Sequence, residues 1–156
     1  MLNIKSLPDS IERPVYGIEL VGGNLPTFEA GEMVELIFNA ALGEQTIRKI
    51  VAAQPVSGMC YPIFRDTANN VTVTNIGRTA IIMREWYGET DQYEDGLAGA
   101  PDGTMLTVSG DVNNQGAWNA AAAGQLVFGR LKRGSALTPA NGGIIEVERI
   151  SSYVFV

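Results

Sequence analysis

The stretch Thr79-Ala80-Ile81-Ile82-Met83-Arg84-Glu85-Trp86-Tyr87 decides the class of fold that the sequence predicts. Its centre is a nearly continuous apolar run, which favours a β-strand that is buried on both faces. Similar short β-prone runs recur from 15 to 156, with turn residues between them. This pattern is typical of a sandwich or barrel, so we expect an all-β fold built as a single compact β-barrel or sandwich.

Two stretches also carry helical signals. Residues 28–42 have apolar side chains at both helical and strand spacing. We expect a strand there, because no capping box precedes the apolar run and residues 46–52 resemble a hairpin partner. Residues 118–123 are rich in alanine, and we expect a helical turn or two at this position. The fold should therefore contain at most one or two short helices.

Turn residues indicate where the remaining expected strands and loops begin and end. Asn69 and Asn70 favour a second hairpin between residues 61–65 and 71–74. Six acids lie in or just before residues 88–103, which we interpret as a long exposed loop. The other expected elements are a turn at 111–115 and strands at 105–108, 125–131, 143–150 and 153–156.

The first fourteen residues differ from the rest of the chain. Their apolar side chains have no sustained period, and Pro14 biases the residue before it toward extended structure. We expect an extended N-terminal arm at 1–14, followed by one β-domain at 15–156 that carries the acidic loop.

Composition excludes several classes of function. The 156 residues include no histidine, so histidine-dependent hydrolases and histidine metal ligands are absent, and the net charge of −6 argues against broad nucleic-acid binding. The single Cys60 cannot form an internal disulfide or a thiolate zinc site. No apolar run has the length of a signal peptide or a membrane span. We expect a soluble, unexported chain that is not an enzyme and has no cofactor, no metal, no nucleic-acid partner and no membrane partner.

Two groups of acidic residues could be interpreted as a metal site or a catalytic site. Residues 91–102 partly match a calcium loop, but Tyr93 occupies a ligand position and Asp102 is short for the last ligand, which favours a solvated acidic loop. Glu146 and Glu148 share one face of a strand, as a glycosidase couple could. Alternation with Val147 is equally typical of a solvent-facing strand, so we interpret this pair as surface charge.

Large aromatic residues stand beside the expected loops. Trp86, Tyr87, Tyr93 and Trp118 can serve as interface anchors or can cap the ends of a barrel, because each has an apolar body and a polar group. The basic patch at residues 130–133 is too small for strong phosphate binding and suits an acidic protein surface.

Two blocks of sequence carry a resemblance to a known family. Residues 122–131 (AAGQLVFGRL) and 144–148 (IIEVE) resemble the last strands of capsid cement proteins, also called decoration or head-stabilisation proteins, of tailed bacteriophages. In that family a Gly-x-x-Val-x-Gly-x-Leu strand pairs with a later Val-rich strand. Residues 30–36 (AGEMVEL) similarly resemble the early strand of the family.

The resemblance implies a structural protein on the capsid exterior of the virion, made in the host cytoplasm. Such a protein binds the outer surface of an assembled capsid and bridges neighbouring capsomers. Its partners would be the major capsid protein and further copies of itself, as a homotrimer rather than a homodimer. The residues that we expect at these interfaces come from the arm, the aromatic set and the basic patch: Leu7, Pro8, Ile11, Arg13, Pro14, Trp86, Tyr87, Trp118 and Arg130.

Two rival functions remain open at this point. The first is a carbohydrate- or peptide-binding β-module of a phage tail or host protein, with Trp86, Tyr87 and Trp118 as a stacking platform. The second is an enzyme that uses carboxylates alone.

Overall fold

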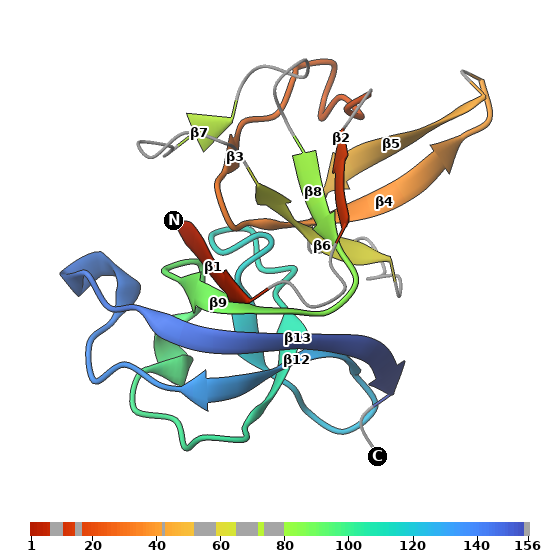
Figure 1. Cartoon of the computed structure of the whole chain (residues 1–156). Helices are drawn as coiled ribbons and strands as arrows, with labels where there is room; N and C mark the ends of the chain where they lie inside the picture. Colours follow the sequence, from red (N-terminus) through yellow and green to blue (C-terminus); the bar gives the residue numbers. More distant parts are fainter. Residues whose placement is uncertain are drawn as a thin grey trace.

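The computed structural model describes residues 1–6, 11–14, 17–41, 43–51, 59–64, 72–73 and 80–154. These residues form two main antiparallel sheets, which lie one above the other in Figure 1. The all-β prediction is confirmed, and a sandwich fits better than a barrel because the sheets do not close. No helix in the described part of the chain is both long and apolar enough to cross a membrane.

The first sheet has six strands in the order β1-β9-β13-β12-β10-β11. The expected strands at 105–108 and 125–131 are confirmed, whereas the two strands expected at 143–156 form one continuous β13. A register shift opposite Val127 and Gly129 absorbs the extra residues of β13 without ending the strand. The strand bounds are β1 Leu2–Ser6, β9 Trp86–Thr90, β10 Met105–Val108, β11 Trp118–Ala120, β12 Leu126–Arg133 and β13 Ile145–Val154.

The second sheet has five strands in the order β2-β8-β6-β4-β5. The strand expected within 28–42 and its hairpin partner are confirmed as β4 and β5. The hairpin expected between 61–65 and 71–74 is wrong, because β6 pairs with β4 and β8 while β7 pairs with β3 in a small separate sheet. The bounds are β2 Ile11–Pro14, β3 Phe28–Glu29, β4 Met33–Asn39, β5 Glu44–Lys49, β6 Cys60–Phe64, β7 Thr72–Val73 and β8 Ala80–Met83.

The stretch 79–87 is two strands instead of one. β8 ends at Met83, and Arg84 adopts a φ of 65°, the only positive φ of a non-glycine residue in the described chain. This left-handed residue redirects the backbone, so that β9 begins at Trp86 in the other sheet. Figure 1 shows the chain in green as it passes from β8 to β9 and joins the two sheets.

The core explains why the centre of this stretch is apolar at every position. Ile82 packs in a cluster between the two sheets, which also holds Met33, Trp86 and Trp118. Ile81 points to the opposite face of the five-stranded sheet, where a second cluster lies beneath Ile18. Both isoleucines are almost fully buried, which confirms the expectation of a strand that is buried on both faces.

The expected free arm at 1–14 is wrong for the described residues. β1 pairs with β9 and forms one edge of the six-stranded sheet, while β2 pairs with β8 at the edge of the five-stranded sheet. The apolar residues lack a common period because these two short strands belong to different sheets. The extended conformation was predicted correctly, but the separation from the body was not.

Two further expectations are corrected. Residues 88–103 are not one exposed loop: residues 88–90 continue β9, and Tyr93 and Leu97 are buried. Gly88 is required there as a strand residue, because a Cβ atom would lie 2.6 Å from the carbonyl oxygen of Asn3 in β1. Residues 118–120 form the strand β11 instead of a helical turn, since pairing with β10 and full burial of Trp118 override the helix propensity of the alanines.

Candidate functional site

The two tryptophans expected at an interface lie in the core. Trp86 is 2% exposed and Trp118 is 0% exposed. Their ring centroids are 6.3 Å apart at an interplanar angle of 69°, an edge-to-face contact that stabilises the packing between the sheets. The prediction that these residues contact a partner is therefore wrong for the folded chain.

Tyr87 and Arg130 lie on the outward face of the six-stranded sheet. The Tyr87 hydroxyl donates to Glu146, and the Arg130 guanidinium donates to Glu148, which also lies 3.3 Å from Lys132. These hydrogen bonds lower the pKa of both carboxyls below the ordinary 4.5; for Glu146 the largest cause is a bond from Lys5. A glycosidase couple needs one carboxyl with a raised pKa, so the pair suits the surface-charge interpretation.

The other expected contact residues come from the first fourteen. Leu7 and Pro8 lie outside the described residues. Ile11, Arg13 and Pro14 belong to the edge strand β2, a position in which proline is tolerated within sheets.

Sequence reasoning missed several exposed apolar side chains, of which Phe38 is the one aromatic among the described residues, at 67% exposed; Val112 is 70% exposed. Phe38 lies on the same face of β4 as Val34 and Leu36, which are buried in a cluster that Ile18 also contacts. Ile18 pairs with Ile47, which lies opposite Leu36, whereas Phe38 lies opposite Gln45, two residue pairs further toward the tip of the hairpin. In Figure 1 the β4–β5 hairpin extends away from the rest of its sheet.

The tip of this hairpin is held by its own turn. The backbone N–H of Gly43 donates to the carbonyl of Asn39 at 2.9 Å, and the Asn39 side chain accepts from the N–H of Ala41 at 3.0 Å. Gly43 has a φ of 67°, which glycine adopts without strain. These hydrogen bonds hold Asn39, Ala41 and Gly43 in place, and groups that are already held lose less conformational entropy on docking. Leu20, Val21 and Leu25, which follow Ile18 in the chain, are also exposed.

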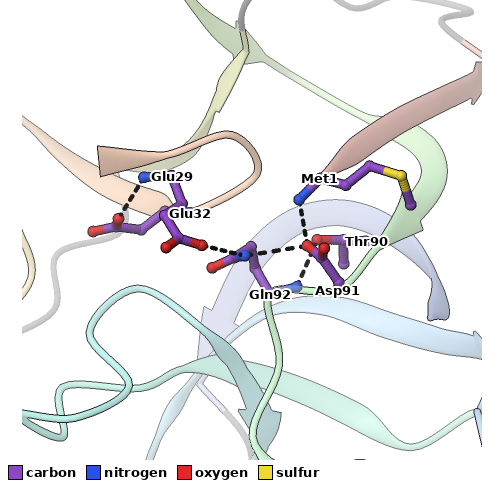
Figure 2. A network of polar contacts seen from close by, with 6 residues as sticks. All are labelled: Met1, Glu29, Glu32, Thr90, Asp91 and Gln92. Carbon is purple, nitrogen blue, oxygen red and sulfur yellow. Dashed lines mark hydrogen bonds and ion pairs between the residues drawn. The ribbon is translucent and has the colours of Figure 1, made fainter. Parts of the chain in front are cut away.

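A polar network joins the two sheets at the opposite end of β4 (Figure 2). The amino group of Met1 contacts Asp91. The amide of Gln92 donates to Asp91 at 3.1 Å and to Glu29 at 3.0 Å. The N–H of Glu29 in turn donates to Glu32 at 3.0 Å. The chain of contacts thus runs from β1 and the end of β9 to β3 and the residue before β4.

Glu32 is the buried member of this network. Its carboxylate is 3% exposed, and Lys49 Nζ lies 3.0 Å from Oε1 and 3.2 Å from Oε2. Burial raises the pKa of Glu32 above 4.5, and Lys49 opposes that shift. A polar cavity of about 310 Å³ opens beside the network, lined chiefly by acid and amide side chains. Since its central carboxyl is already paired, we interpret the network as a polar tie between the sheets.

Comparisons with family models, with curated proteins and with solved structures found no match. Function is therefore inferred from the surface of this chain.

Proposed function

We propose that the chain is a non-enzymatic structural protein that binds the outer surface of an assembled phage capsid and stabilises it by bridging neighbouring major capsid proteins. The observation that carries the proposal is the exposed Phe38 on β4, in a hairpin that projects from its sheet. Phe28, Phe128 and both tryptophans are buried. A large aromatic residue that is held out in solvent is suited to fill a pocket of a partner protein.

The energy of one such contact is modest. Burying a phenylalanine side chain contributes about 1.5–3 kcal/mol, which gives a weak complex for a single copy. A homotrimer would present three hairpins to capsid subunits that are held at fixed spacing, so the second and third contacts form at high effective concentration. We therefore expect this chain to act as an oligomer, and avidity explains how a small contact can stabilise a shell.

Two further observations support this function. β12 and β13 carry the blocks that resemble decoration proteins, and they pair with each other as the last strands of that family do. Burial of Trp86 and Trp118 removes the stacking platform on which the carbohydrate-binding alternative rested.

Sedimentation with capsids of the encoding phage that were assembled without this chain tests the proposal. We expect the wild-type chain to sediment with the capsids and Phe38→Ser to bind at least tenfold more weakly, because it loses the apolar anchor. Leu137→Ser is the matched control, since Leu137 is 52% exposed but lies beside the six-stranded sheet. Equal binding of Phe38→Ser and wild type, or no binding of wild type, would overturn the proposal.

A further inference from the structure

A second cavity opens where the chain crosses from the five-stranded to the six-stranded sheet. Its volume is about 260 Å³. β6, the β8–β9 crossover and β13 contribute its lining, which combines two arginines with hydroxyl and apolar side chains: Tyr61, Met83, Arg84, Glu85, Arg149, Ile150 and Ser151.

Arg149 is the buried charge at this cavity. Its side chain is 5% exposed, and its guanidinium donates to the carbonyl of Phe128 at 2.8 Å and to the carbonyl of Cys60 at 3.2 Å. The Nε–H has no acceptor among the described residues. Two of the five N–H groups of this guanidinium thus donate to neutral main-chain oxygens, and the Nε–H is left without a described acceptor.

No described carboxylate forms an ion pair with Arg149. The buried acids Glu32 and Glu35 differ in this respect, because Lys49 and Arg48 pair with them. A buried charge without a counter-ion is costly, and burial lowers the pKa of the Arg149 guanidinium from its ordinary value. An arginine nonetheless keeps its proton at neutral pH. Among the described residues its charge lies 5.4 Å from the centre of the Phe128 ring and has no ion-pair partner, so the cavity wall is positively charged at this point.

Arg84 adds a second guanidinium to the same lining. It holds a left-handed backbone at a φ of 65°, which a glycine would adopt without strain. Strained residues of this kind concentrate at sites of function, where the side chain has a role that offsets the cost. Arg84 is exposed at the rim, whereas Arg149 is buried.

Glu85 is the acid of the lining. It is exposed, and its Oε1 accepts a hydrogen bond from Ser151 at 3.3 Å. The described residues of the lining include two arginines and one glutamate, and so carry one excess positive charge. The excess favours an anion with a single charge.

We propose that this cavity binds a carboxylate, with Arg149 as the buried anchor and Arg84 as the residue at the rim. The planar guanidinium matches the two oxygens of a carboxylate, and the apolar sides of Met83 and Ile150 suit a short aliphatic stem behind it. Either a small free acid or a glutamate side chain of a partner protein presents this chemistry. The site does not depend on the capsid-binding function.

Nuclear magnetic resonance of the arginine Nε–H groups tests the site directly. We expect sodium acetate to shift the Arg149 signal in a saturable way, while sodium chloride at equal ionic strength does not. A peptide acetyl-Gly-Glu-Gly-amide, compared with its glutamine counterpart, separates a partner side chain from a free acid as the source. An identical response to acetate and chloride would overturn the proposal.

Arg84→Gly is the variant that tests the role of the rim. Removing the guanidinium should weaken acetate binding at least threefold, whereas the melting temperature of the free protein should stay equal or rise, because glycine relieves the left-handed backbone. Arg133→Gln is the matched control, since Arg133 is exposed on β12, away from the cavity lining, and acetate binding should be unchanged. Unchanged acetate binding in Arg84→Gly would contradict the assignment.

Discussion

The outer faces of the two sheets differ in charge and in exposed apolar surface. On the outward face of the six-stranded sheet, charged side chains on neighbouring strands pair with one another. Lys5 lies 2.6 Å from Glu89 and 2.8 Å from Glu146. The five-stranded sheet has an apolar outer face, where a second cluster buries Val34 and Leu36 of β4, while Phe38 on the same face is 67% exposed. One sheet thus pairs the charges of its outer face, and the other exposes a large aromatic side chain, which is the contact that we propose for a partner.

The largest effect should come from the core that both sheets share. Trp118→Ala removes a side chain with no exposed surface, and we expect a loss of about 3–5 kcal/mol in the free energy of unfolding. Trp118→Phe keeps most of the apolar volume and should lose less. Denaturant unfolding measures both values, and a single transition is expected because the cluster joins the two sheets. Two separate transitions would show that the sheets fold independently.

Removal of residues 1–6 should have the next largest effect. It deletes the edge strand β1 together with the half-buried Leu2 and Ile4, and we expect a loss of about 2 kcal/mol. The substitution Lys5→Ala, which keeps the strand and removes only an exposed charge, should cost less. If the shortened chain were as stable as the full chain, β1 would be a free arm after all.

Local patterns predicted strands where pairing partners are close in sequence. The β4–β5 hairpin and the strand β12 were identified from alternation and turn residues alone. The break at Arg84 could not be predicted, because a left-handed arginine leaves no signal in an apolar run. The strand β11 was missed because its conformation depends on distant β10, and the alanines after Trp118 favour a helix locally.

The candidate site was harder to predict than the fold. Trp86 and Trp118 were chosen for their type, but burial depends on how two sheets pack, and that is a property of the whole chain. Phe38 was identified as a strand residue on an apolar face. Its exposure could not be predicted, because it depends on which parts of the chain pack on this face of the sheet, and that is a property of the whole fold.

Two acids should give opposite dependences of stability on pH. Because the pKa of Glu32 is raised in the folded state, its contribution favours folding at low pH and is lost as pH rises above 4.5 through the folded pKa. The lowered pKa of Glu148 stabilises the fold above 4.5, and this contribution is lost as pH falls through the folded pKa.

Urea unfolding on both sides of pH 4.5 measures these contributions. Glu32→Gln should flatten the dependence on the alkaline side, and Glu148→Gln should flatten it on the acid side. If both variants flattened the pH dependence on the same side of pH 4.5, this would contradict a raised pKa for Glu32 and a lowered pKa for Glu148.

The smallest effect on the isolated chain should come from Phe38→Ser, which alters an exposed side chain and should change the free energy of unfolding by less than about 0.5 kcal/mol. The same variant tests the central claim most directly when the melting temperature of capsids is measured by calorimetry. Wild-type protein should raise that temperature, because a ligand that binds only the assembled shell stabilises it by mass action, and Phe38→Ser should not. An unchanged capsid melting temperature with excess wild-type protein would contradict the account.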